Sequence, residues 1–169
     1  MCHAMSDIDP IAEAQRQWEA HGWRAAAPGM TMVTQVVRVQ QLLQGRIDAV
    51  LRPFNLSFAR YEILRLLAFS RSGSMPMTRL GSLLQVHAAS VTSAVSRLEA
   101  QGFAERVRDK SDRRIIRASI TEQGRSVVDR ATLQLNEIVF EQPRLTDAQV
   151  TELTALLNSY RSATGDLPA

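Results

Sequence analysis

Six basic side chains lie within the twelve residues 106–117. Only Asp109 and Asp112 oppose them, so the segment has a net charge of +4. The whole chain carries +3, and the remainder is therefore slightly acidic. A concentrated positive charge neutralises nucleic-acid phosphates and releases their counterions. The basic residues are Arg106, Arg108, Lys110, Arg113, Arg114 and Arg117.

The segment just before this cluster, Ala88 to Leu98, predicts an amphipathic helix. Val91, Val95 and Leu98 recur at i, i+4 and i+7 and would be buried. Small hydroxyl side chains on the other face would let the helix lie deep in a major groove and bond to base edges or phosphates. That face carries Ser90, Thr92, Ser93, Ser96 and Arg97. The alternative is a solvated surface helix, which the neighbouring basic cluster disfavours.

The elements around these residues predict a winged helix-turn-helix. Thr78 is expected to cap a short helix over 79–85, a turn at Val86–His87 follows, and the next helix runs over 88–101 to Gly102. Apolar and polar residues alternate over 103–120, around a turn at 109–112, which predicts a β-hairpin. The fold class is mainly α with a small β-hairpin wing. In such a fold the second helix enters the major groove.

Helical periodicity predicts the remaining elements as helices over 8–22, 31–52, 58–70, 121–140 and 147–162, with a linker at 25–29. Chain length favours a single compact domain. Within it we expect an N-terminal extension over 1–30, dimerisation helices in 31–56 and 121–169, and a DNA-binding region over 57–120. The terminal helices carry more apolar surface than one small domain covers, which predicts a symmetric dimer.

Several motifs, in this order, resemble the MarR (multiple antibiotic resistance regulator) family. They are Thr78-Arg-Leu-Gly-Ser-Leu-Leu-Gln85, Ser90-Val-Thr92, Arg97-Leu-Glu-Ala-Gln-Gly102, Asp112-Arg-Arg114 and Ile120-Thr-Glu-Gln-Gly124. The resemblance covers about residues 31–162. It implies a ligand-responsive repressor that binds a pseudo-palindromic DNA site as a homodimer.

The resemblance also implies roles for single residues. Ser90, Thr92 and Ser93 would approach bases, Asp112 would shape the wing, and Arg114 or Arg113 would enter the minor groove. His87 departs from the Ser or Thr that often caps this helix in the family, and it is either a cap or a phosphate contact.

Members of the family typically bind small aromatic or anionic effectors between the dimer helices and the winged domain. The resemblance therefore suggests a pocket here, which the N-terminal helix with Trp18, His21 and Trp23 could cover and which Arg38 could also line. The alternative is that Trp18 and Trp23 pack against the dimer interface. The candidates are Trp18, His21, Arg46, Phe54, Phe58 and Arg60.

Other functional classes find little support in the sequence. We see no catalytic, nucleotide-binding or metal-ligand motif, and expect neither an enzyme nor a cofactor. His3, His21 and His87 are too scattered for a zinc site. Cys2 is an unpaired thiol, which fits a reducing cytoplasm; a redox role for it is a minor alternative. No apolar run is long enough to cross a membrane. The rival hypothesis is a protein-interaction module that reuses the winged fold without binding DNA.

Overall fold

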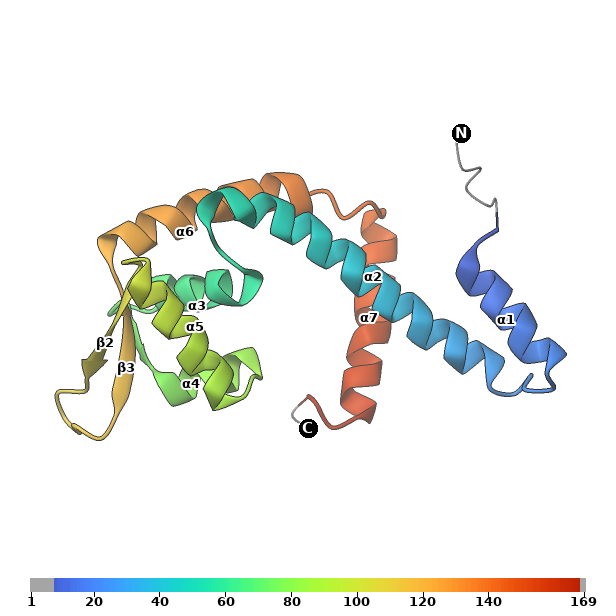
Figure 1. The fold of residues 1–169 in the computed structure, drawn as a ribbon, viewed down its shortest axis with the longest axis horizontal. Helices are drawn as coiled ribbons and strands as arrows, with labels where there is room; N and C mark the ends of the chain where they lie inside the picture. The colour runs from blue at the N-terminus through green and yellow to red at the C-terminus, as the bar shows by residue number, and fades with distance from the viewer. Residues whose placement is uncertain (1–7, 168–169) are drawn as a thin grey trace. The chain divides into compact units, whose positions relative to one another are not determined.

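Helices and a small sheet between Ile47 and Val139 pack around one hydrophobic core in the computed structural model, which describes residues 8–167 (Figure 1). No helix among these described residues is both long and apolar enough to span a bilayer. In chain order the elements are α1 (Pro10–Ala20), α2 (Ala27–Leu51), the 3-10 turn η1 (Arg52–Phe54), α3 (Phe58–Phe69), β1 (Ser74–Pro76), α4 (Met77–Leu84), α5 (Ala88–Ala100), β2 (Ala104–Arg108), β3 (Ile116–Ile120), α6 (Glu122–Leu135), the π-helical turn η2 (Asn136–Phe140) and α7 (Asp147–Ala163).

The chain divides into two compact units, 1–46 and 47–169, where its length had predicted one. The boundary falls within α2. In the first unit, Asp9 caps α1 by accepting a hydrogen bond from the backbone N–H of Ile11 at 3.0 Å. The Thr31 hydroxyl of α2 donates to Gln15 Oε1 of α1 at 3.2 Å. The two helices of this unit therefore contact each other.

Helix α2 begins at Ala27, so the predicted linker over 25–29 is wrong in its second half. Pro28 lies in the first turn, where a backbone N–H has no partner within the helix, so the ring costs nothing there. At the other end α2 stops at Leu51, and η1 leads to Asn55 with φ of 55°. Pro53 lies in that turn, where proline cannot continue the α-helix.

The helix-turn-helix consists of α4 and α5. The predicted cap Thr78 is wrong, because α4 begins at Met77, directly after the extended residue Pro76. The side chain of His87 caps α5 by accepting from the N–H of Ala89 at 3.3 Å, which confirms the cap; the phosphate contact stays a prediction. Gly102 follows α5 with φ of +74°, as a C′ glycine does.

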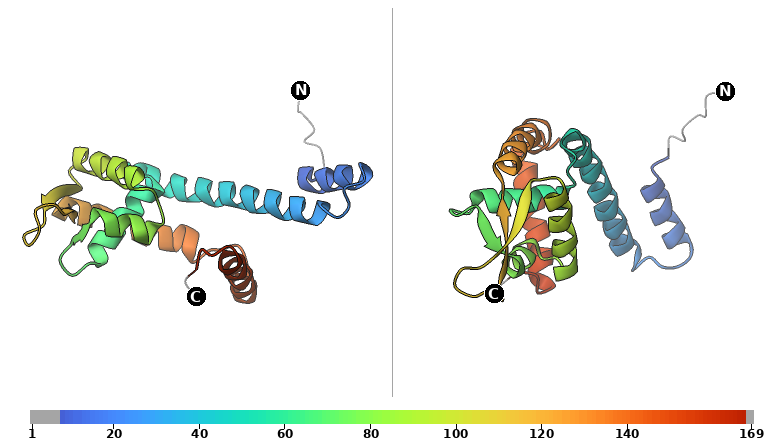
Figure 2. Two further views of the ribbon diagram at one scale, coloured as in Figure 1. Left: turned by 90° about the horizontal axis from the view of Figure 1, so that it is seen from below. Right: turned by 60° about the vertical axis from the view of Figure 1, so that its left-hand side comes forward.

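The predicted hairpin is confirmed as β2 and β3, but the sheet has a third strand that the sequence analysis missed. The order is β1-β3-β2, all antiparallel, and Met75 of β1 is opposite Ala118 of β3. Figure 2 shows the hairpin extending past the helices beside it. Strand β1 is only three residues long and contains Pro76, so no alternating pattern marked it.

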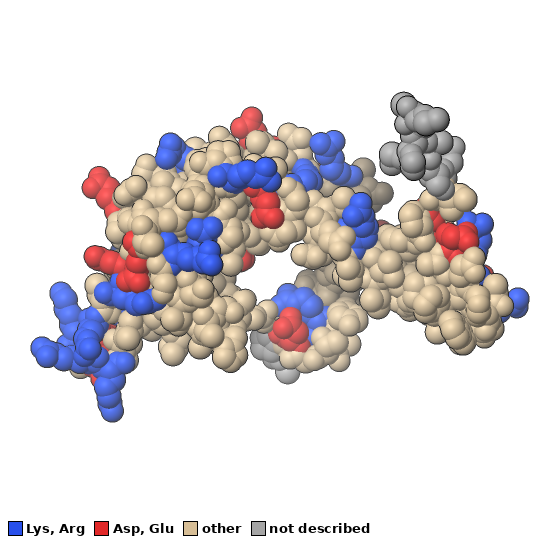
Figure 3. Space-filling view, in the orientation of Figure 1, with Lys and Arg blue, Asp and Glu red and all other residues tan. Residues whose placement is uncertain are grey.

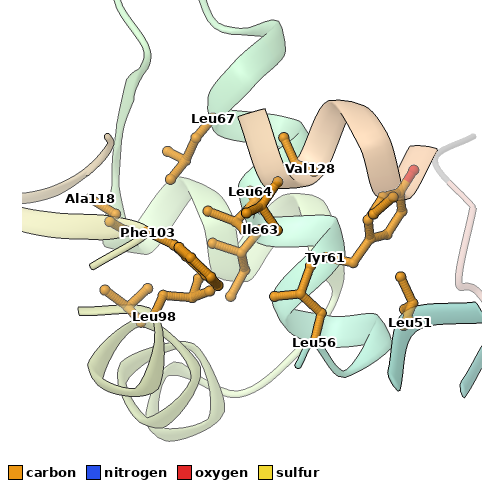
Figure 4. Packing of buried hydrophobic residues seen from close by; sticks show 14 of the residues in the cluster. Leu51, Leu56, Tyr61, Ile63, Leu64, Leu67, Leu98, Phe103, Ala118 and Val128 are labelled. Carbon is orange, nitrogen blue, oxygen red and sulfur yellow. The ribbon is translucent and has the colours of Figure 1, made fainter. Parts of the chain in front are cut away.

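The core joins every element of the winged region (Figure 4). Leu64 and Leu67 of α3, Leu98 of α5 and Val128 of α6 are completely or almost completely buried. Ala118 of β3 closes the core on the sheet side. The predicted inner face of α5, which we call the recognition helix, is confirmed, because Val91, Val95 and Leu98 are all buried.

Helix α6 attaches directly to the start of the wing. Thr121 caps it by accepting from the N–H of Gly124 at 3.0 Å, and the Thr121 hydroxyl donates to the Gly102 carbonyl at 2.7 Å. A Cβ at Gly124 would lie 2.0 Å from the Phe103 carbonyl oxygen, so this close approach requires glycine.

Helix α7 begins with a capping box formed by Thr146 and Gln149. Its apolar stripe includes Leu153, Leu157 and Tyr160, all of which are exposed in the single chain. The helix therefore has an apolar face that its own chain does not cover.

Candidate nucleic-acid interface

One face of α5 is polar and open to solvent over its whole length. Its side chains are exposed as the sequence predicted: Ser90, Thr92, Ser93, Ser96 and Arg97. The helix has almost no long side chain on this face, so its backbone can approach a groove floor closely. The core contacts of Val91, Val95 and Leu98 fix which face points outward.

The tip of the wing, residues 108–115, is organised by Asp109. Its Oδ1 accepts hydrogen bonds from the Ser111 N–H at 2.8 Å, the Ser111 hydroxyl at 2.5 Å and the Asp112 N–H at 3.3 Å. The Ser111 hydroxyl contributes most to lowering the pKa of the Asp109 carboxyl to about 2. The carboxylate therefore stays ionised, and the bonds to it stay intact, well below neutral pH.

Asp112 holds Arg114. Its Oδ1 accepts from the Arg114 N–H at 3.0 Å and from Nε at 3.1 Å, while Oδ2 accepts from the guanidinium at 3.0 Å. The bond from the Arg114 side chain is the main reason that the pKa of Asp112 is lowered. Arg114 is still 91% exposed, so its guanidinium points outward from a carboxylate that fixes its direction.

Arg106 lies back against the recognition helix. Its guanidinium donates to the Thr92 carbonyl at 3.0 Å and to the Ser96 hydroxyl, and it pairs with Glu99 at 3.3 Å. The Arg106 backbone N–H also donates to Glu99 Oε1 at 2.9 Å. We call these contacts the Arg106 brace. They join β2 to α5. Arg106 and Ser96 were both predicted to contact DNA, but in this structure their side chains bond to each other.

Arg117 is also held within the fold. It donates to the Ser74 hydroxyl at 3.1 Å, to the Ser74 carbonyl at 3.0 Å and to Asp109 at 3.1 Å. The residue thereby links β1 to the wing turn. Of the six basic residues in the cluster, Arg106 and Arg117 position the wing.

The other basic side chains remain available at the tip. Arg108, Lys110 and Arg113 line an open hollow of about 580 Å³, together with Asp109. Within residues 8–167 these three have no hydrogen bond or ion pair through their side chains. Figure 3 shows Lys and Arg side chains gathered at this end of the hairpin. The predicted concentration of charge on the wing is therefore present in the structure.

The candidate effector-pocket residues take part in separate local contacts. Trp18 and His21 pack on Trp23, with ring centroids 5.4 and 5.8 Å apart. The Arg130 guanidinium lies 5.8 Å from the Phe54 ring centroid. The Phe58 ring stacks on the Tyr61 ring, with centroids 6.1 Å apart. Arg60 lines a groove together with residues of α5. Arg46 is half-buried in α2.

Two residues of the site were not predicted as such from the sequence. Arg60 was assigned to the effector pocket, and Ser57 was not identified as a site residue. They line an open groove of about 510 Å³ with Ser90, Ser93 and Arg97 of α5. Arg60 is held by Ser57 Oγ at 3.2 Å and Gln101 Oε1 at 2.8 Å. Burial and the nearby Arg97 lower the pKa of Arg60. The contact joins residues far apart in sequence, so spacing gave no signal for it.

Comparison with known proteins shows which proteins this chain is similar to. A profile described as the MarR family matches residues 56–116. The chain is 31% identical to an uncharacterized HTH-type transcriptional regulator, YpoP, of Bacillus subtilis, over 75% of this chain and 89% of that protein.

Solved structures agree with this match. Sco5413 of Streptomyces coelicolor, described as a MarR family transcriptional regulator, is 39% identical with a TM-score of 0.75. It aligns over 84% of this chain and 99% of its own. Sco3205 from the same organism, solved in complex with DNA, is 25% identical with a TM-score of 0.69, over 82% of this chain and 87% of its own.

Proposed function

Because the chain belongs to the MarR family of DNA-binding transcriptional regulators, we propose that it binds a pseudo-palindromic operator as a homodimer. The observation that carries the proposal is the polar face of α5 beside a wing tip with available cationic side chains. The hydroxyls of α5 would bond to base edges or phosphates in the major groove, and Arg114 would enter the adjacent minor groove, whose negative potential attracts arginine. Arg108, Lys110 and Arg113 would neutralise flanking phosphates.

The dimer proposal follows from apolar surface that a single chain leaves exposed. Helix α2 exposes Val33, Val36 and Val37, and α7 exposes Leu153 and Leu157. In a twofold-symmetric dimer, a second copy of the chain would cover this exposed apolar surface, and no other protein would be needed. Such a dimer would present two copies of α5 about 34 Å apart, one turn of DNA.

We further propose that the output is repression and that a small aromatic or anionic effector releases the DNA. An effector acts if it binds one dimer geometry better than the other and so changes the spacing of the two α5 helices. The Trp18, His21 and Trp23 cluster supports an aromatic ligand in the N-terminal unit, since Trp23 is 54% exposed. Quenching of tryptophan fluorescence by candidate aromatic acids, with matched loss of DNA binding, tests this part.

The DNA-binding proposal is tested by fluorescence anisotropy with a labelled duplex from the region upstream of the protein's own gene. We expect affinity to fall steeply as KCl rises, because bound phosphates release counterions. Arg114→Ala should weaken binding at least tenfold. Arg24→Ala removes the same charge from an exposed position outside the site and serves as the matched control. Wild-type affinity in Arg114→Ala would remove that residue from the site.

The main alternative is a protein-interaction module with the same fold. It predicts salt-insensitive or absent DNA binding, so the same titration separates the two. We also propose that the protein is not an enzyme, needs no cofactor and works in the cytoplasm, where its DNA target lies. Operator-dependent repression by the intact protein, without turnover of any added metabolite, is the result expected.

A further inference from the structure

The groove between the start of α3 and the recognition helix contains two arginines that no acidic side chain neutralises. Arg60 of α3 and Arg97 of α5 both line it, and the pKa of Arg60 is lowered first by burial and then by the charge of Arg97. Within residues 8–167 neither guanidinium pairs with a carboxylate. Two cations that line one groove repel each other, and an anion between them reduces that repulsion.

The remaining lining of the groove suits an anion with several oxygen atoms. Ser90 and Ser93 are exposed on α5, and their hydroxyls have no hydrogen-bond partner among the described residues. Each can donate one hydrogen bond. With the guanidinium of Arg97, they form a row on one side of the exposed face of α5.

Arg60 is already held in position on the opposite wall. It donates to Ser57 Oγ and to Gln101 Oε1, and the Gln101 amide in turn donates to the Asn55 carbonyl at 2.8 Å. A side chain fixed in this way loses little conformational freedom when an anion arrives. A guanidinium also binds phosphate through two parallel hydrogen bonds, which a single ammonium cannot do.

We propose that this groove binds a backbone phosphate of the DNA duplex, with Arg60 and Arg97 as its two cationic walls. The inference rests on the proposed DNA-binding function and extends the contact surface beyond α5 and the wing. A DNA strand is favoured over a free anion because the groove is open and shares Ser90, Ser93 and Arg97 with the face that is proposed to lie on DNA. The recognition helix would then be held by phosphates on the side opposite the Arg106 brace.

The test uses the full-length protein and a set of duplexes from the upstream region of its gene. In each duplex one phosphate per half-site is replaced by an uncharged methylphosphonate. The variants are Arg60→Gln, Arg97→Gln and the double variant, with Arg24→Gln as the control for loss of one charge. The Arg97 side chain makes no hydrogen bond or ion pair within the described part of the chain, so its variant should fold normally.

We expect one neutral phosphate to weaken binding by the wild type at least fivefold and to leave the double variant unaffected at that position. The double variant should also reduce the slope of log affinity against log salt by about 0.9 for each bound subunit. Arg24→Gln should keep both wild-type properties. If the double variant retains the wild-type slope and remains sensitive at every position, the phosphate site is refuted while DNA binding stands.

A second arm separates DNA from a free anion as the ligand. Inorganic phosphate is added at constant ionic strength and the Tm is measured. If phosphate raises the Tm of the wild type but not of Arg60→Gln, while the DNA-binding slopes of the two proteins are equal, the groove serves a free anion and the proposal is wrong. Absence of salt-sensitive binding to every duplex by the wild type would instead overturn both the site and the proposed function.

Discussion

Replacement of Glu99 by alanine separates positioning of the wing from simple electrostatics. Glu99 is an acidic residue beside the proposed DNA surface, so removal of its charge should tighten DNA binding if only long-range attraction matters. In the structure, however, the Glu99 carboxylate accepts from the Arg106 N–H at 2.9 Å and pairs with its guanidinium at 3.3 Å. Its loss should therefore loosen the attachment of β2 to α5, although the bonds of Arg106 to Thr92 and Ser96 remain, and should weaken DNA binding.

The size of the effect follows from the hydrogen bond and the ion pair that the substitution removes. A hydrogen bond to a charged group contributes about 1.5–3 kcal/mol. The ion pair adds at most about 1 kcal/mol, because both side chains are about one-third exposed (32% and 31%) and solvent screens them. Solvent also weakens the hydrogen bond from the Arg106 N–H to Glu99. We therefore take about 2 kcal/mol as the free energy by which Glu99 holds the wing against α5. That value corresponds to about a 30-fold change in the docked-to-undocked ratio, since 1.4 kcal/mol is tenfold.

The assay is fluorescence anisotropy at fixed salt with the upstream duplex, paired with amide hydrogen exchange. We expect Glu99→Ala to bind at least threefold more weakly and the Arg106 amide to exchange faster. Glu105→Ala is the matched control, because Glu105 is exposed on the same strand and its side chain makes no hydrogen bond or ion pair within residues 8–167. Equal or tighter binding by Glu99→Ala, as expected for Glu105→Ala, would refute the brace.

Three further predictions concern stability, pH and assembly. Gly124→Ala should lower the Tm by several degrees, because its Cβ would lie 2.0 Å from the Phe103 carbonyl oxygen and overpacking costs about 1–3 kcal/mol, whereas Gly29→Ala, which meets nothing within 4 Å, should not. The Asp109 turn should contribute stability above the ordinary carboxyl pKa and lose it as pH falls through the lowered value of about 2, so the Ser111 amide signal should have its NMR titration midpoint near 2; a midpoint near 4 would contradict this. Leu157→Asp places a charge on the exposed apolar face of α7 and should shift the protein from dimer to monomer in sedimentation equilibrium, while an unchanged dimer would exclude that face.

The sequence predicted the fold largely because its signals are local. The amphipathic spacing of Val91, Val95 and Leu98 determined the outward face of α5, and Gly102 marked its end. Thr121 and Thr146 cap α6 and α7 through backbone N–H groups three positions away, a contact that is local in the sequence. Strand β1 was missed because its pairing with β3 spans more than forty residues and its own sequence is too short to alternate.

The roles of individual arginines depended on contacts that spacing does not reveal. Arg106 and Arg114 are equivalent in a charge count, yet one lies against Thr92 and Glu99 while the other is held outward by Asp112. Arg60, a candidate for the effector pocket, also lines a groove with Arg97, which its position in the sequence did not indicate. Such assignments require the tertiary structure, because the partners come from different elements.

The most direct measurement of the central proposal is hydrogen exchange, followed by mass spectrometry, of the full-length protein with and without the upstream duplex. If α5 and the wing bind DNA, peptides from 88–100 and 108–116 should become protected, and α1 should not. Protection confined to other segments, or no protection at saturating DNA, would contradict the proposal that this helix and this hairpin contact the duplex.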